Sequence, residues 1–229
     1  MISIAMPVYE SFGRGVEFLS HHFEKFETQT YKNFEVVISD HSKTDAIEDF
    51  CKNYKTDNFT VKYERNREKR GNFTFNTNKA MQRCTGKIIK ILYQDDFLWD
   101  DNSLQKIEDS FDDETKWLVT SYAHTHDGQN FFNEETPVYN EKIYTGNNTI
   151  GNPSVLSVRN DDSLLMFDEK MIWAVDIDYY KRLHDNFGPP KILNEKTVAI
   201  RLWDKQMTHL IPPKRKAKEI SMSIGKHEK

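Results

Sequence analysis

The sequence has little of what marks several large classes of protein. It has only 2 cysteines in 229 residues, so a reducing compartment is indicated and a disulfide framework is not. No apolar stretch approaches the length needed to span a membrane. The first residues, MISIAMPVYE, have no basic region ahead of their apolar run, unlike a signal peptide. The net charge of -4 argues against nucleic acid as the main partner. We therefore expect a cytoplasmic protein.

Large aromatic side chains, by contrast, are plentiful. The chain has 15 Phe, 10 Tyr and 4 Trp, which is enough to fill one hydrophobic core. The composition does not change abruptly at any point, as it would at a linker, so a single domain is expected.

Apolar runs and helix-like segments alternate in the first half of the chain. The runs cover residues 2–9, 34–40, 59–65 and 88–93, and the segments between them repeat apolar residues at helical spacing. Strands joined by helices run parallel, with right-handed crossovers. The pattern predicts an α/β fold built on a largely parallel sheet.

The second half is less regular. After a helix centred on Ile107, residues 117–149 indicate short strands and loops, followed by a helix over 176–184 and a strand near 198–203. We expect no ordered structure in the tail that begins at Pro212. Its basic residues, Lys214, Arg215, Lys216 and Lys218, indicate either a solvated terminus or contact with the inner face of an anionic membrane.

Polar side chains follow three of the predicted strands. Tyr9 and Glu10 end the first, Asp40 the second, and Asp95 and Asp96 the fourth. In an open parallel sheet the ligand binds beyond the carboxyl ends of the strands. Adjacent carboxylates repel unless a cation or donors lie between them, so Mn²⁺ or Mg²⁺ is a natural occupant. The alternative is a solvated acidic turn that caps the next helix.

Four segments in a fixed order carry a family resemblance. The segments PVYE, FEVVISDHSKTD, TGKIIKILYQDDFLWD and FDEKMIWAVDIDYYKRL resemble the motifs of family 2 glycosyltransferases, over residues 1–183. The resemblance implies the GT-A fold, a Rossmann-like three-layer sandwich with a mostly parallel central sheet and a smaller antiparallel or irregular acceptor-side region. It also implies one catalytic domain over 1–211, with a nucleotide-sugar half (1–116), an acceptor half (117–211) and a basic tail (212–229).

The same resemblance assigns the donor side of the site. It implies that Asp95 and Asp96 contact the ribose and the metal-bound diphosphate. Arg70 lies in a segment similar to the family's donor-side loop, with a solvated basic loop as the alternative. The remaining donor-side residues that it implies are Pro7, Tyr9, Glu10 and Asp40.

The sequence also departs from the family pattern. Tyr93 and Val175 occupy positions that are often acidic in relatives, and His41 follows Asp40 where relatives often continue with a glycine turn. A late histidine completes the metal site in some GT-A enzymes, and His209 is a candidate here. The first two departures keep open a domain that binds sugar nucleotide or glycan without turnover.

Asp176 is the expected catalyst. By resemblance it is the general base that deprotonates an acceptor hydroxyl, and an attacking alcohol needs such a group. The implied reaction is a single inverting displacement on a nucleoside-diphosphate-sugar, with UDP favoured and a glycan, lipid-linked or protein acceptor. A helix-dipole role for Asp176 is the structural alternative. A sugar nucleotidyltransferase is a weaker alternative, because Gly13-Arg14-Gly15 matches its glycine-rich basic signature poorly.

Overall fold

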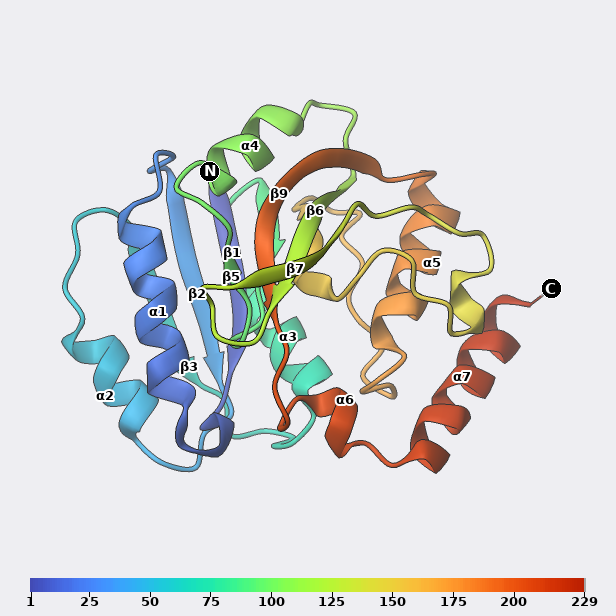
Figure 1. Ribbon diagram of the computed structural model, residues 1–229, viewed down its shortest axis with the longest axis horizontal. Helices are drawn as coiled ribbons and strands as arrows, with labels where there is room; N and C mark the ends of the chain where they lie inside the picture. Colours follow the sequence, from blue (N-terminus) through green and yellow to red (C-terminus); the bar gives the residue numbers. More distant parts are fainter. Residues whose placement is uncertain (229) are drawn as a thin grey trace.

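The computed structural model describes residues 1–228, which form one mixed sheet flanked by helices (Figure 1). The strand order is β3-β2-β1-β4-β8-β6-β9-β5, and β7 pairs with β6. The strands are β1 (Ile2–Val8), β2 (Phe34–Asp40), β3 (Thr60–Arg65), β4 (Ile88–Ile91), β5 (Phe97–Leu98), β6 (Trp117–Thr125), β7 (Phe131–Glu135), β8 (Leu156–Arg159) and β9 (Lys191–Arg201). The helices are α1 (Gly15–Glu27), α2 (Ala46–Asn53), α3 (Phe73–Gln82), α4 (Ser103–Ser110), α5 (Val175–Phe187), α6 (Met207–Leu210) and α7 (Pro213–His227), with short 3-10 turns η1 (Ser11–Gly13), η2 (Ile143–Thr145) and η3 (Pro153–Val155).

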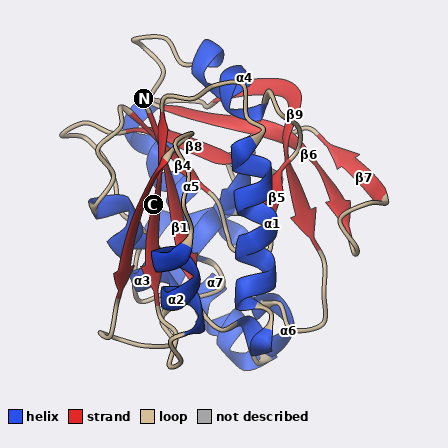
Figure 2. Ribbon diagram, turned by 90° about the vertical axis from the view of Figure 1, so that its left-hand side faces the viewer, coloured by secondary structure: helices blue, strands red, loops and turns tan. Residues whose placement is uncertain are grey.

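The first four strands form the parallel part of the sheet. β1 pairs in parallel with β2 and β4, and β2 pairs in parallel with β3. Alternate residues of β1 face opposite layers, as in any strand. Ile4 and Met6 pack in one core with Leu19 of α1, whereas Ala5 packs in a second core with Met81 of α3. Figure 2 shows the strands as one twisted sheet with helices beside it. The predicted α/β fold is confirmed.

The second half continues the same sheet. β8 runs antiparallel between β4 and β6, and β6 pairs in parallel with β9. The expectation of short strands and loops over residues 117–149 is wrong for β6, which is nine residues long and almost wholly buried. Polar residues obscured it in the sequence. The hydroxyl groups of Thr120 and Thr197 lie 2.7 Å apart inside the sheet and satisfy one another.

The C-terminal segment is an ordered helix, so the expectation of an unstructured tail is also wrong. α7 starts with Pro213 at its first position, where a missing N–H costs nothing. Glu219 and Ser223 are buried, and Ile220 packs against the second core. α7 lies beside α5 and η2 (Figure 1). Within residues 1–228, no helix has the length and apolar character required to cross a membrane.

Candidate functional site

A cavity of about 540 Å³ lies beyond the carboxyl ends of β1 and β4. Its lining comes from the ends of these two strands, the loop before α3, the start of α5 and the segment after β9. Among the residues predicted from the sequence, the lining includes Pro7, Tyr9, Glu10, Arg70, Asp95 and Asp176. The structure therefore brings together side chains up to 169 positions apart in the chain.

Gln94 fixes the loop that follows β1. Its Oε1 accepts hydrogen bonds from Tyr9 N at 3.0 Å and from Ser11 Oγ at 2.9 Å, and its Nε2 donates to Gly15 O at 3.0 Å. Ser11 and Phe12 have positive φ angles of 47° and 54°, a conformation that costs free energy unless contacts hold it. Gln94 supplies such contacts, and sequence reasoning missed it.

Asp95 and Asp96 have different surroundings. Asp96 is only 1% exposed, and its Oδ1 and Oδ2 accept hydrogen bonds from Arg201 N at 3.0 Å and Asn152 Nδ2 at 2.7 Å. Asp95 lines the cavity, and its Oδ2 accepts a hydrogen bond from Trp203 Nε1 at 2.9 Å. Burial and the charge of Asp95 raise the pKa of Asp96 to about 7, and burial also raises the pKa of Asp95.

Of the two carboxylates, only Asp95 is placed to bind a divalent ion. Across residues 1–228, no cluster of three or more His, Cys, Asp or Glu side chains could hold a metal on its own. Mg²⁺, however, is commonly bound by one or two carboxylates together with substrate phosphates. Asp95 can serve as such a ligand from the cavity wall, whereas both oxygens of Asp96 face protein donors. His209 is exposed on α6 and is not among the residues that line the cavity.

Asp176 lies in the first turn of α5, on the cavity wall. Its Oδ1 accepts a hydrogen bond from Ile177 N at 2.8 Å, and its Oδ2 accepts one from Asn148 Nδ2, also at 2.8 Å. Asn148 is itself held, because its Oδ1 accepts from Ile150 N and Gly151 N. Burial raises the pKa of Asp176 to about 6, so the group is both oriented and more basic than an ordinary aspartate.

Asp40 is not brought to the cavity. It is fully buried, and its two carboxylate oxygens accept hydrogen bonds from Ser42 N and Tyr63 Oη, each at 2.7 Å. The next residue, His41, lines the cavity instead. Its Nε2 is buried without a hydrogen-bond partner among the described residues, and its ring stacks on Phe75. The sequence marked His41 only as a departure from the family turn.

The last residue of β9, Arg201, and the segment after it, with Trp203, contribute two contacts that the sequence did not indicate. Arg201 donates from its backbone N to Asp96 and from its Nε to the backbone oxygen of Asp95, at 3.1 Å. Trp203 lines the cavity and packs edge-on against Phe12 and Phe18. Both contacts cross more than a hundred residues, so no local pattern could have revealed them.

An α/β sheet with a cavity at its carboxyl edge, lined by Asp95 and Asp176, has the arrangement of a glycosyltransferase domain of the GT-A fold. The chain belongs to glycosyl transferase family 2, whose family model matches residues 3–169. The predicted family is thus confirmed. A search of the curated proteins finds no match.

Solved structures show the same fold at low sequence identity. S. aureus TarS has a TM-score of 0.65 and 18% identity, over 89% of this chain and 37% of that one. TarS 1-349 in complex with UDP-GlcNAc has a TM-score of 0.66 and 16% identity, over 97% and 66%. The mannosyltransferase PcManGT from Pyrobaculum calidifontis, in complex with GDP-Man and Mn²⁺, has a TM-score of 0.65 and 13% identity, over 98% and 63%. The chain therefore spans between 37% and 66% of the length of these proteins.

Proposed function

We propose that this protein transfers a sugar from a nucleoside-diphosphate-sugar to an acceptor hydroxyl, with inversion at the anomeric carbon. One observation carries the proposal: Asp95 from the end of β4 and Asp176 from the start of α5 line the same cavity. A transferase needs one group beside the leaving diphosphate and another beside the attacking hydroxyl. The two carboxylates supply these two positions.

The donor side of the proposal uses the ends of β1 and β2, the loop before α3 and Asp95. Tyr9, Glu10, His41 and Arg70 line this part of the cavity and would contact the nucleotide. The related structures include complexes with UDP-GlcNAc and with GDP-Man, and we favour a UDP-sugar. A Mn²⁺ or Mg²⁺ ion held by Asp95 and the diphosphate would offset the charge that develops on the leaving group.

The acceptor side depends on Asp176. An oriented carboxylate with a pKa of about 6 is ionised at neutral pH and still binds a proton more readily than an ordinary aspartate, which suits a general base. No covalent intermediate is needed, since the alcohol displaces the diphosphate in one step. Its proton passes to Asp176 as the new glycosidic bond forms.

The acceptor proposed is a glycan, a lipid-linked saccharide or a protein. Lys214 and Lys218 are exposed on α7, and such side chains attract anionic lipid headgroups. Membrane contact by a cytoplasmic enzyme is therefore part of the proposal. Cosedimentation with vesicles of 30% phosphatidylserine should decrease for the Lys214→Glu, Lys218→Glu double variant. Equal binding of the two proteins would remove the membrane from the proposal.

The first test is a thermal-shift panel of UDP, GDP, UDP-GlcNAc and GDP-Man, with and without Mn²⁺. A ligand that binds only the folded state must raise the melting temperature. At a ligand concentration a hundred times Kd, the folded state gains about 2.7 kcal/mol of free energy. A rise with one nucleotide family, enhanced by Mn²⁺, supports the donor site. The absence of a rise with every ligand would contradict the proposal.

The second test separates transfer from binding. Asp176→Asn should retain the nucleotide-induced rise in melting temperature and lose activity by roughly 100-fold or more, because the amide cannot accept the proton. Asp185→Asn changes an exposed aspartate of the same helix and serves as the matched control. If nucleotide binds and neither variant alters a measurable turnover, Asp176 is not the base. If nucleotide binds but the native protein shows no turnover, the binding-only alternative replaces catalysis.

A further inference from the structure

Glu219 of α7 accepts hydrogen bonds from three successive backbone N–H groups. Its Oε2 lies 3.0 Å from Ile172 N, 2.8 Å from Trp173 N and 3.1 Å from Ala174 N. The residue is 0% exposed. A carboxylate on three amide donors is a strong, directional hold on backbone, since each bond involves a charged acceptor.

These amides lead directly into α5. Ala174 is the N-cap of that helix, and its own side chain forms no capping hydrogen bond. The first N–H groups of a helix have no partner within the helix, and a negative charge there is favourable. Glu219 supplies both the acceptor and the charge from a position 45 residues further along the chain.

Arg215 completes the contact. Its Nε donates to Oε1 of Glu219, and its Nη2 donates to Lys170 O at 3.0 Å. Burial alone would raise the pKa of Glu219, but hydrogen bonds from Trp173 N and Arg215 hold it below its ordinary value. Glu219 therefore stays ionised. One turn of α7, through Glu219 and Arg215, is hydrogen-bonded to the backbone of residues 170–174.

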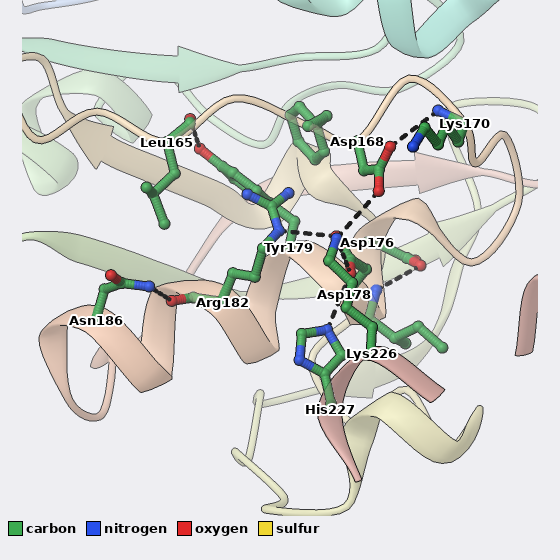
Figure 3. A network of polar contacts seen from close by, with 12 residues as sticks. Leu165, Asp168, Lys170, Asp176, Asp178, Tyr179, Arg182, Asn186, Lys226 and His227 are labelled. Atoms are coloured by element: carbon green, nitrogen blue, oxygen red, sulfur yellow. Dashed lines mark hydrogen bonds and ion pairs between the residues drawn. The ribbon is translucent and has the colours of Figure 1, made fainter. Parts of the chain in front are cut away.

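The other end of α7 is also tied to α5, as Figure 3 shows. The buried carboxylate of Asp178 lies 2.8 Å from Lys226 Nζ and 2.9 Å from His227 Nε2, and it accepts a hydrogen bond from Arg182 Nε at 2.8 Å. Lys226 also pairs with Asp168 at 3.0 Å. Two separate contacts thus join α7 to α5, and the contact through Glu219 is the one made to residues that line the cavity.

The segment that Glu219 holds through backbone hydrogen bonds, residues 172–174, forms part of the cavity wall. Ile172, Trp173, Val175 and Asp176 all line the cavity, and Asp176 comes two residues after the last amide that Glu219 holds. A shift of that backbone would move the carboxylate of Asp176 and the side chains beside it together. Misplacement by about 1 Å can lower a rate by roughly 100-fold.

We propose that Glu219 is a positioning residue for glycosyl transfer, holding residues 172–174 so that Asp176 keeps its place on the acceptor side of the cavity. The inference rests on the proposed role of Asp176. It adds that the last helix of the chain acts on the reaction through backbone contacts and touches neither donor nor acceptor.

The test compares Glu219→Gln with Glu228→Gln, the same substitution at an exposed glutamate that directly follows the helix. The probe is UDP release from UDP-GlcNAc, or GDP release from GDP-Man if the thermal-shift panel selects that donor. We expect kcat of Glu219→Gln to fall roughly 10- to 100-fold, with Kd for the free nucleotide unchanged within about twofold, since the donor-side residues lie on other elements. Glu228→Gln should match the native protein in both values.

A purely structural role makes a different prediction. Lys226→Met removes a contact at the far end of α7 and should lower the melting temperature without reproducing the fall in kcat. An equal fall in kcat for Lys226→Met and Glu219→Gln at equal loss of stability would overturn the inference, as would an unchanged kcat in Glu219→Gln. If Glu219→Gln does not fold, Arg215→Lys is used in its place, because it keeps the charge but loses the bond to Lys170 O. Its kcat should fall less than that expected for Glu219→Gln, and its Kd for the free nucleotide should stay unchanged. An unchanged kcat in Arg215→Lys would then count against Glu219.

Asp176→Asn, measured in parallel, distinguishes the two possible failures. Full activity of Asp176→Asn overturns the proposed function together with the inference built on it. Loss of activity in Asp176→Asn with full activity in Glu219→Gln leaves the proposed function standing and overturns the positioning role alone.

Discussion

The pH dependence of turnover follows from the environment of Asp176. Burial raises its pKa from 3.8 to about 6, and only the ionised carboxylate can accept a proton from the acceptor. At saturating donor, kcat should be near its plateau at about pH 7.5 and about tenfold lower at pH 5, because roughly one tenth of the groups are then ionised. An aspartate with an unshifted pKa would lose less than about a tenth of its activity over the same interval.

The assay is the release of UDP from UDP-GlcNAc in buffers of constant ionic strength, with nucleotide affinity measured at each pH. That control is needed because the pKa values of Asp95 and Asp96 are also raised and their protonation would weaken donor binding. If nucleotide affinity is constant across this pH range while log kcat falls by one for each pH unit, the acidic part of the profile reports the protonation of one group on the acceptor side. An unchanged kcat at pH 5, or the same fall in kcat in Asp176→Asn, would refute the reasoning.

The protonation of Asp176 is not expected to lower kcat at acidic pH by unfolding the protein. A carboxyl group whose folded-state pKa is raised favours the folded protein when protonated, so its contribution is present below the unfolded value of about 4 and is lost as the pH rises through about 6. Acid therefore increases the stability that comes from Asp176 while it decreases activity. Melting temperatures recorded at each pH would reveal any unfolding caused by other groups.

Two further predictions concern single contacts. Trp203→Phe keeps an aromatic ring but removes the hydrogen bond from Nε1 to Asp95, so the Mn²⁺-dependent part of UDP affinity should weaken about tenfold by calorimetry, and affinity equal to that of the native protein would contradict a role for Asp95 in metal binding. Gly146→Ala places a Cβ 2.4 Å from Ile220 Cδ1 at a φ of +104°, so it should cost about 2–4 kcal/mol in urea unfolding. Adding Ile220→Val should recover about 1 kcal/mol of that loss, and a Gly146→Ala protein as stable as the native one would show that α7 does not pack tightly on η2.

Local patterns in the sequence predicted the first half of the fold well. The apolar runs at 2–9, 34–40 and 88–93 correspond to β1, β2 and β4, because strands buried on both faces need continuous apolar residues. The same patterns located Asp95 and Asp96 in the segment that follows β4. They could not show that Asp96 turns inward to Asn152 and Arg201, since these partners come from distant segments.

The errors have a common physical origin. The segment from Pro213 is rich in lysine and has few apolar residues, so its periodicity is weak, and its order comes from tertiary contacts such as those of Glu219. Asp40 also has partners that the sequence did not indicate. Its position at a strand end was predicted correctly, but the hydroxyl group of Tyr63 that turns its carboxylate away from the cavity belongs to the neighbouring strand. Partners that complete a buried polar group are set by packing and leave no local pattern.

The hydrogen bonds from main-chain amides to Glu219 have a consequence for which residues of this enzyme can be substituted. Every amino acid except proline offers the same N–H, so the three hydrogen bonds to Glu219 can form whichever side chains residues 172–174 carry. Ile172 and Trp173, which line the cavity, can therefore be replaced with these bonds kept, although a replacement of Trp173 also removes its contact with Lys216. On the proposed mechanism, the placement of the base is separate from the shape of the surface that meets the acceptor, and libraries at these two positions would test for altered acceptor preference.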